Sequence, residues 1–236
     1  MTVQLFCGDC LDILPTLEAW SVDAAITDPP FFVTITSQSK RTPSFEFLKQ
    51  AEWRAAFGWI AQVERLLIDG GTLYAFTNDE DIAMFKRAIS EVGMRVYQRL
   101  HWIKTNPLPS YTKHNYRGGV ELAFYCCKGK KPAYFAERTQ QELYSYWMMP
   151  IVGGKKRTKH PTQKPIALMK EWITNSCPPG GTVFDPFMGS STTGVACVQT
   201  GRNFIGIEID PGYFEIAKAR IESAQQEMIQ GVLANA

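Results

Sequence analysis

A carboxylate, two prolines and an aromatic ring follow directly after the apolar run 24–27. These residues are Asp28, Pro29, Pro30 and Phe31. Proline fixes φ and has no backbone N–H, so the segment offers carbonyl oxygens and the Asp28 carboxylate but few donors. Such an all-acceptor site suits a substrate amino group, and the Phe31 ring could stack on a planar nucleobase. The alternative is an ordinary proline turn at the end of a strand.

A second candidate site begins where a strand predicted over 182–184 runs into a turn of small residues and a helix start. The turn holds Asp185, Phe187, Gly189, Ser190 and Thr192. Small residues let a ligand approach the backbone, and a helix N-terminus attracts a carboxylate or phosphate. Glu208 stands 19 residues after Gly189, at the end of the next predicted strand. An acid at that place is typically a hydrogen-bond acceptor for ribose hydroxyls.

The order of strand, turn, helix, strand and terminal acid predicts a cofactor that carries a nucleoside. The turn departs from the dinucleotide pattern G-x-G-x-x-G, which disfavours a dehydrogenase. S-adenosylmethionine fits the turn better, because it presents an adenosine and a charged amino-acid tail instead of two phosphates.

The elements that would position both sites alternate between short apolar strands and amphipathic helices. This alternation is typical of a mostly parallel sheet with helices on both faces. Strands are predicted over 3–6, 24–27, 72–77, 95–103, 120–127, 182–184 and 203–207, and helices over 53–68, 79–91, 165–176, 191–199 and 212–225. No helix separates the strands over 95–103 and 120–127, so these two are expected to form an antiparallel hairpin. The predicted fold class is α/β, a Rossmann-like domain with a seven-stranded mixed sheet.

Charge is distributed unevenly along the chain. The formal net charge is +2, yet residues 95–164 hold 14 Lys or Arg and 3 Asp or Glu, whereas the rest of the chain holds 11 and 20. Aromatic residues lie among these cations, including Tyr111, Tyr116, Tyr134, Phe135, Tyr144, Tyr146 and Trp147. Cations mixed with rings are typical of nucleic-acid contact, although a basic block can also be a solvated surface. Two basic inserts for target recognition are predicted, over 104–119 and over 128–159, the second irregular and partly mobile.

The length of 236 residues, 45% of them hydrophobic, predicts a single domain over 1–236. The sequence has no apolar run of about 18 residues and no signal-peptide start, so a cytoplasmic protein without membrane contact is expected. The six cysteines follow no secreted framework, which favours reduced thiols. Cys7 and Cys10 form a lone C-x-x-C without further ligands, so no metal site is predicted.

With both sites considered, the chain resembles the beta class of DNA amino-methyltransferases, which methylate exocyclic amino groups of adenine or cytosine. In that family a catalytic Asp-Pro-Pro-Tyr/Phe motif precedes a cofactor Phe-x-Gly motif, as the Asp28 motif precedes Phe187-Met188-Gly189 here. Between them, His160-Pro161-Thr162-Gln163-Lys164-Pro165 resembles the family's segment leading to the cofactor pocket. Taken alone, this segment could simply mark a helix start. Three motifs in the family's order argue against chance.

The resemblance implies S-adenosylmethionine as the cofactor. Its expected contacts are Asp9, Asp28, Thr162, Gln163, Lys164, Asp185, Phe187, Gly189, Ser190, Thr192 and Glu208. Among these, Asp9 is expected near the adenine, Glu208 at the ribose, and Lys164 near the carboxylate of the amino-acid tail. Ser191 departs from the family's commoner second glycine.

The expected catalytic residues are Asp28, Pro29, Pro30 and Phe31. Asp28 and the Pro29 carbonyl would accept the two N–H bonds of a base flipped out of duplex DNA, while Phe31 stacks on it. By resemblance, Asp at the first motif position favours adenine N6 over cytosine N4. A homodimer is left open. The alternatives are a cytosine-N4, RNA-base or protein-glutamine methyltransferase, and a DNA-binding homologue without catalysis.

Overall fold

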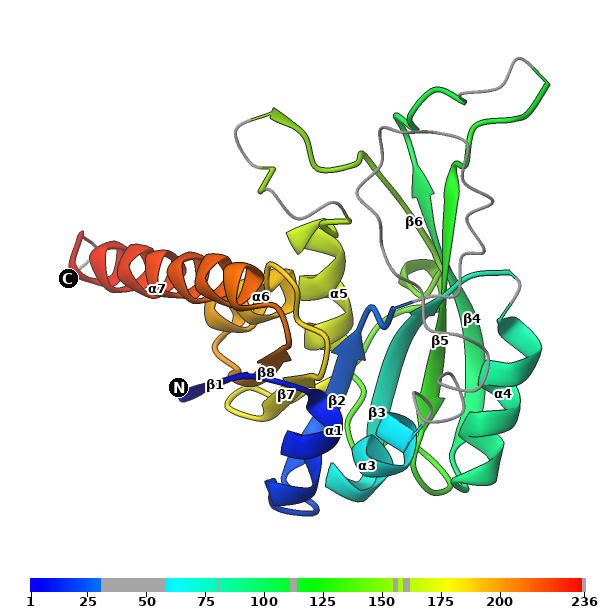
Figure 1. Ribbon diagram of the computed structural model, residues 1–236, viewed down its shortest axis with the longest axis horizontal. Helices are drawn as coiled ribbons and strands as arrows, with labels where there is room; N and C mark the ends of the chain where they lie inside the picture. The colour runs from blue at the N-terminus through cyan, green and yellow to red at the C-terminus, as the bar shows by residue number, and fades with distance from the viewer. Residues whose placement is uncertain (31–57, 80, 111–113, 155–156, 159–161, 235–236) are drawn as a thin grey trace.

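The protein is represented by a computed structural model, which describes residues 1–30, 58–79, 81–110, 114–154, 157–158 and 162–234 (Figure 1). Within these ranges eight strands form one mixed sheet. They are β1 (Val3–Cys7), β2 (Val22–Thr27), β3 (Leu67–Thr77), β4 (Arg95–Lys104), β5 (Val120–Cys127), β6 (Tyr146–Met149), β7 (Thr182–Asp185) and β8 (Asn203–Glu208). The order is β1-β8-β7-β2-β3-β5-β4-β6, and every pairing is parallel except those of β5 with β3 and β4.

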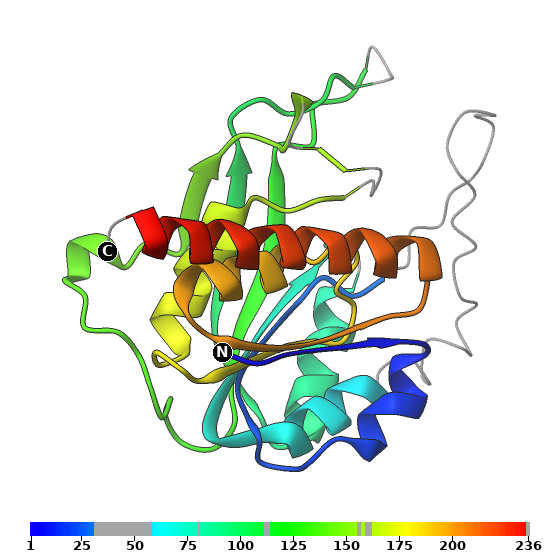
Figure 2. The same cartoon turned by 90° about the vertical axis from the view of Figure 1, so that its left-hand side faces the viewer.

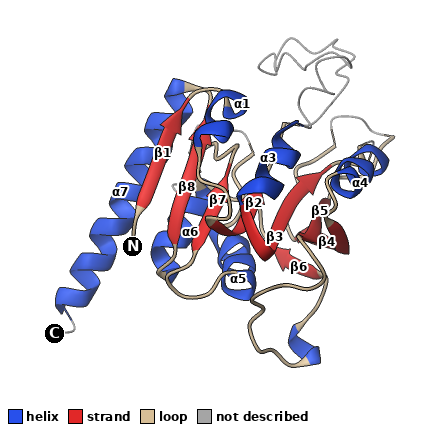
Figure 3. Ribbon diagram, turned by 90° about the horizontal axis from the view of Figure 1, so that it is seen from below, coloured by secondary structure: helices blue, strands red, loops and turns tan. Residues whose placement is uncertain are grey.

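Helices cover both faces of the sheet, as Figure 3 shows. One face carries α1 (Cys10–Ile13), the 3-10 turn η1 (Leu14–Thr16), α3 (Gly58–Leu66) and α4 (Ile82–Glu91). The other carries α5 (Ile166–Ser176), α6 (Thr192–Thr200) and α7 (Pro211–Ala234), with α7 packed along α6 (Figure 2). A further 3-10 turn, η2 (Gln140–Glu142), lies in the connection to β6. Each face buries its own apolar cluster, which makes the sheet the central layer of the fold.

The predicted count of seven strands is wrong, because β6 forms an eighth at the sheet edge. Its four residues alternate between exposed and partly buried, and it pairs with β4. The Trp102 indole N–H donates to the Met149 carbonyl at 3.0 Å, and the His101 N–H donates to the Ser145 carbonyl at 2.9 Å. An alternating pattern of only four residues does not distinguish a strand from a loop in the sequence. The segment is a strand because it pairs with β4. Part of the insert predicted as irregular is therefore ordered.

The helix predicted over 53–68 ends earlier than expected. Its first five residues lie outside the described ranges, and α3 stops at Leu66, where β3 begins at once. The Lys128 ammonium donates to the carbonyls of Glu64 at 2.7 Å and Leu67 at 2.9 Å, which satisfies the free end of the helix. Gly70 lies within β3 at φ +76°, where a Cβ would stand 2.5 Å from the Ala133 backbone nitrogen.

The antiparallel hairpin of β4 and β5 is confirmed, with Trp102 opposite Glu121 in its register. The remaining predicted helices are present, although α7 extends to Ala234, well past its predicted end. All six cysteines are free. Among the helices of the described ranges, none combines the length and apolar character needed to cross a membrane.

Candidate active site

Three acids gather where neighbouring parallel strands end. Asp28 follows β2, Asp185 ends β7 and Glu208 ends β8. These strands lie side by side in the order β8-β7-β2, so their carboxyl ends share one edge of the sheet. Both candidate sites therefore open on one rim of the sheet, which is the usual ligand position in such folds.

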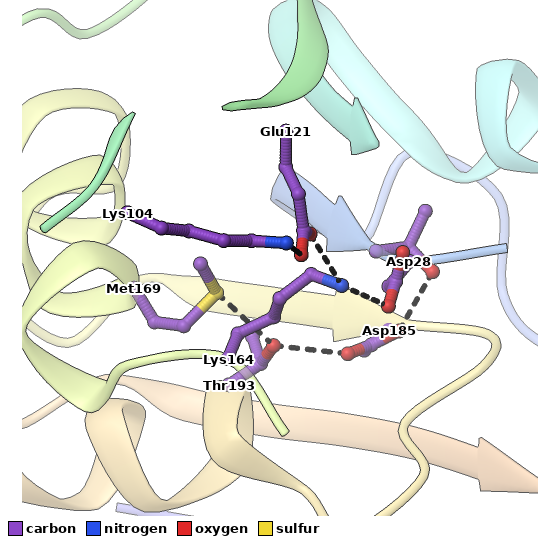
Figure 4. A network of polar contacts seen from close by, with 8 residues as sticks. Asp28, Lys104, Glu121, Lys164, Met169, Asp185 and Thr193 are labelled. Atoms are coloured by element: carbon purple, nitrogen blue, oxygen red, sulfur yellow. Dashed lines mark hydrogen bonds and ion pairs between the residues drawn. The ribbon is translucent and has the colours of Figure 1, made fainter. Parts of the chain in front are cut away.

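Asp28 is the first member of a network of alternating charges (Figure 4). The Lys164 ammonium contacts Asp28 Oδ2 and lies 3.0 Å from Glu121 Oε2. On the far side, Lys104 Nζ lies 2.9 Å from Glu121 Oε1. The second oxygen of Asp28, Oδ1, is buried and accepts no hydrogen bond from any described residue. A buried carboxylate oxygen without a donor is costly, which makes it a candidate for contact with a ligand.

Within this network the charges of neighbouring groups act against the effect of burial on the pKa of each group. Burial alone would lower the pKa of the Lys164 ammonium, but Asp28 and Glu121 outweigh it and raise that pKa. Burial raises the pKa of the Asp28 carboxyl, and the Lys164 ammonium opposes this effect. Burial also disfavours the Glu121 carboxylate, yet Lys164 and Lys104 hold its pKa below the ordinary value. The Phe76 ring, 4.5 Å from Lys164 Nζ, adds a cation–π contact.

Asp185 is buried in different surroundings, because donors occupy both of its oxygens. Thr27 Oγ1 donates at 2.8 Å, Thr193 Oγ1 at 2.9 Å and the Phe187 backbone N–H at 3.1 Å. Burial still dominates and raises the pKa of the Asp185 carboxyl to about 7. This side chain ties the end of β2 to the turn after β7 and to the start of α6.

The turn after β7 is bound to the end of β8 through Glu208. The Gly189 N–H donates to Glu208 Oε2 at 2.9 Å, and the Asp210 N–H donates to Oε1 at 2.9 Å. Gly189 has φ +50°, and Ser191, immediately before α6, has φ +53°. The left-handed backbone at position 191 explains why a glycine would be favourable there.

A cavity of about 40 Å³ lies between the Asp28 network and α6. Its lining comprises Thr27, Asp28, Phe76, Thr162, Gln163, Lys164, Met169, Asp185, Met188, Ser190, Thr192 and Thr193. Seven of the predicted site residues are therefore brought together here, from segments far apart in the sequence. The cavity is much smaller than a pocket for a whole nucleoside, so it can form only the inner end of a longer binding groove.

The other predicted cofactor contacts, Asp9, Phe187, Gly189 and Glu208, lie near the end of β8 or in the turn after β7. The Gly8 N–H donates to the Glu208 carbonyl at 2.9 Å, which places the start of α1 beside Glu208. Asp9 itself caps α1 by accepting the Leu11 N–H at 2.8 Å. The Phe187 ring packs edge-on against Trp59, with 5.4 Å between ring centroids. This contact turns Phe187 towards the core.

Within the acceptor motif, Pro29 is buried and Pro30 is exposed, whereas Phe31 lies outside the described residues. Five further residues of this site belong to none of the predicted site residues: Phe76, Lys104, Glu121, Met169 and Thr193. The sequence could have indicated Glu121 as a site residue, because it is an acid in an otherwise apolar strand. It is also one of only three acids in the strongly basic stretch 95–164. The others look like ordinary strand and helix residues.

The predicted basic inserts are divided between the two ends of the sheet. The 104–119 connection leaves β4 and enters β5 beside the Lys104–Glu121 pair, and it rises above the sheet in Figure 1. The Ile151 N–H donates to Asn106 Oδ1 at 2.7 Å, so the end of the second insert meets the first. Lys128, by contrast, follows β5 at the opposite end and is bound to α3.

The mixed sheet, with an acceptor motif after β2 and an acid at the end of β8, defines the class of Rossmann-like methyltransferases. Comparison with known proteins narrows this class. The chain belongs to the family of N6/N4 DNA methylases, whose model matches residues 22–219.

Two curated relatives carry names from the same chemistry. The Type II methyltransferase M2.MboI of Moraxella bovis is 29% identical over 239 residues, covering 92% of this chain and 86% of the relative. The Type II methyltransferase M.HinfI of Haemophilus influenzae is 28% identical over 239 residues, covering 91% of this chain and 67% of the relative.

Solved structures agree with this assignment. The crystal structure of the M1.HpyAVI–SAM complex is 31% identical, covers 93% of this chain and 99% of that chain, and superposes with a TM-score of 0.77. The PvuII DNA methyltransferase, described as cytosine-N4-specific, also gives 0.77 but is 19% identical, so it supports the fold alone. The predicted Rossmann-like methyltransferase fold is thereby confirmed, with eight strands instead of seven.

Proposed function

We propose that this protein transfers a methyl group from S-adenosylmethionine to the N6 amino group of adenine in DNA. The observation that carries the proposal is Asp28 Oδ1, a buried acceptor without a donor among the described residues, at the carboxyl end of β2. An amino nitrogen is a donor of the kind that this oxygen lacks.

The residues of the rim fit the cofactor chemically. Glu208 keeps acceptor capacity for ribose hydroxyls beyond its two backbone donors. Lys164 and the N-terminus of α6 offer positive charge to the carboxylate of an amino-acid tail, and the cavity between them suits that inner end. The complex of M1.HpyAVI with SAM supports the same cofactor here. When bound, S-adenosylmethionine supplies the electrophilic methyl group.

The chain's own part in the reaction is to orient the amino nitrogen. The lone pair of an exocyclic amino group is delocalised into the ring, so acceptors on its two N–H bonds are needed to localise it. Asp28 Oδ1 accepts a hydrogen bond from one N–H group of the amino nitrogen and the Pro29 carbonyl accepts one from the other. These two contacts orient the nitrogen towards the methyl group. Phe31 stacks on the flipped base. None of the six cysteines belongs to the acceptor motif, so no cysteine nucleophile is invoked.

Adenine is proposed because the motif begins with Asp, which by family resemblance favours N6 methylation. Cytosine N4 is the second candidate, since the same acceptors suit its amino group. Duplex DNA is the proposed partner, held by the basic inserts. Both curated relatives are named Type II methyltransferases, which supports a role in restriction–modification. A homodimer and a cytoplasmic location stay predictions.

The test is a methyl-transfer assay with labelled S-adenosylmethionine and unmethylated duplex DNA, followed by nuclease digestion and identification of the modified nucleoside. N6-methyldeoxyadenosine is the expected product. If the product is N4-methyldeoxycytidine, the substrate is cytosine, the second candidate, and not adenine. RNA and a glutamine-containing protein serve as competing substrates, and label in either of them but not in DNA would contradict a DNA methyltransferase. Absence of label everywhere would favour a binding-only homologue.

A further inference from the structure

Glu121 joins the Asp28 network from the antiparallel hairpin, outside both sequence motifs. It lies near the start of β5, and its side chain is 27% exposed. One carboxylate oxygen faces Lys164 at 3.0 Å and the other faces Lys104, at the end of β4, at 2.9 Å. Both oxygens of Glu121 are therefore engaged by ammonium groups, and Lys164 is shared between two carboxylates.

This sharing has a consequence for Asp28. If Lys164 faced Asp28 alone, the two would form a closed ion pair in a buried place, and the carboxylate would be a weaker acceptor for a third group. Because the Lys164 ammonium also contacts Glu121, it neutralises the Asp28 carboxylate less completely. Asp28 therefore stays a stronger acceptor for a further donor. The Lys164 contact also stays on Oδ2, which leaves Oδ1 free.

We propose that Glu121, held by Lys104, is a positioning residue for methyl transfer: it shares Lys164 with Asp28, fixes the Asp28 carboxylate with Oδ1 open, and keeps that oxygen a strong acceptor. This inference rests on the proposed function of Asp28. Glu121 itself touches neither substrate nor cofactor, so its effect reaches the reaction through Lys164.

The charged groups around Asp28 predict how the pH dependence of the rate responds to mutation. Those of the described elements are Lys164 before α5, Glu121 on β5, Lys104 on β4 and Asp185 on β7. Glu121 raises the pKa of Asp28, whereas Lys104 lowers it. Removing either charge should therefore move the acid limb of the rate profile, and the two shifts should have opposite signs.

The experiment compares Glu121→Gln and Lys104→Gln with wild type in single-turnover methyl transfer, at saturating DNA and S-adenosylmethionine, across a pH series. With Glu121→Gln we expect a plateau rate about tenfold lower and an acid limb that moves to lower pH. With Lys104→Gln the limb should move to higher pH. The dissociation constant of S-adenosylmethionine should change less than about twofold in both variants, since Lys164 remains.

Glu171→Gln is the matched control. Glu171 lies 3.4 Å from Arg138 and its side chain is 30% exposed, so the control breaks a pair of similar burial away from the rim. It should keep the wild-type rate and limb. Glu121→Asp retains the charge and should return the limb towards its wild-type position, which also covers the case that Glu121→Gln does not fold.

The outcomes separate this inference from the proposed function. Shifts of opposite sign, absent in Glu171→Gln, support the positioning role. An acid limb that stays at the wild-type pH in both variants overturns it, while loss of transfer in Asp28→Ala would leave the proposed function standing. Wild-type protein that methylates no DNA would remove the proposed function and this inference together.

Discussion

Asp28 and Asp185 are both carboxylates at the ends of neighbouring strands, but their surroundings give them different roles. Asp185 accepts hydrogen bonds from two threonine hydroxyls and a backbone N–H, so its capacity is used within the fold. Asp28 keeps one buried oxygen without a described donor, and its other oxygen is held by Lys164. The first side chain fixes the turn after β7, and the second is available for chemistry.

Substitution of Asp28 tests this division directly. Asp28→Ala removes the acceptor and should lower the methyl-transfer rate by at least about 10²–10³-fold, as expected when a preorganised electrostatic contact is lost. The dissociation constant of S-adenosylmethionine should stay within a few-fold of wild type, measured by calorimetry. Asp23→Ala is the control, because Asp23 also lies on β2 but accepts the Thr182 N–H at 2.7 Å. An Asp28→Ala variant with wild-type turnover would refute the mechanism in which Asp28 orients the amino group.

The burial of Asp185 predicts a pH-dependent stability. Its pKa is raised to about 7 in the folded protein, whereas an unfolded Asp has about 3.9, so folding favours the protonated form. The contribution of this group is full below pH 4 and is lost as the pH rises through 7, at up to about 1.4 kcal/mol per pH unit. In urea unfolding, the stability of wild type minus that of Asp185→Asn should therefore fall from pH 4 to 7 and then level. A constant difference would show that the raised pKa is absent.

At the scale of elements, the same residue type serves two purposes in the basic part of the chain. Lys128 looked like a member of a basic insert, yet its ammonium donates to two carbonyls at the end of α3 and lies 3.9 Å from the Trp20 ring. It also lies 3.2 Å from a Glu64 carboxylate oxygen. Lys128 therefore joins α3, β3 and β5, and the pattern of charges alone could not distinguish it from the exposed Lys130.

Lys128→Met should accordingly act on stability and not on DNA binding. The loss of hydrogen bonds from a buried ammonium should lower the free energy of unfolding by about 2–3 kcal/mol, measured by urea denaturation. DNA affinity of the folded variant should match wild type. Lys130→Met, at an exposed position, should change stability by less than about 0.5 kcal/mol. Weaker DNA binding by Lys128→Met without loss of stability would reverse this assignment.

At the scale of the whole molecule, the sheet brings the 104–119 connection and the part of the second insert around residues 149–151 to the edge that carries the acceptor motif. The 104–119 connection begins and ends beside the Lys104–Glu121 pair, and the Thr105 N–H donates to the Met149 carbonyl at 3.2 Å, next to the second insert. Lys104, Arg117 and Lys164 belong to the segments at this edge, and the stretch 95–164 that contains them is net basic whereas the remaining chain is net acidic. This arrangement favours DNA approach from the side of the rim.

Arg117, exposed in the 104–119 connection, provides a test of that orientation. If it contacts a phosphate, Arg117→Ala should weaken DNA binding at all sequences and reduce the slope of log affinity against log salt by about 1. Binding is measured by fluorescence anisotropy at several salt concentrations. Lys218→Ala, which removes an exposed cation from α7, should leave the slope unchanged. Equal effects of both substitutions would indicate non-specific attraction without a defined DNA face.

Much of the fold could be predicted because its signals are local. Apolar runs marked seven strands, glycine and proline marked the turns, and the missing helix between 103 and 120 marked the antiparallel hairpin. β6 and the true end of α3 escaped, since each depends on a partner elsewhere: β4 for the first and Lys128 for the second. The motif order around Asp28 and Gly189 was enough to identify the family.

The sequence by itself determined the class of chemistry, because the Asp28 acceptor motif and the terminal acid Glu208 each follow a strand that the local pattern of apolar residues predicts. Only the tertiary structure decided which of the predicted residues meet, and that Glu121 and Lys104 join them. Ion pairs and free acceptors depend on distances between separate segments of the chain, such as those of Asp28 and Lys164, which are 136 residues apart. Those distances follow from strand order and packing, which no local pattern in the sequence records.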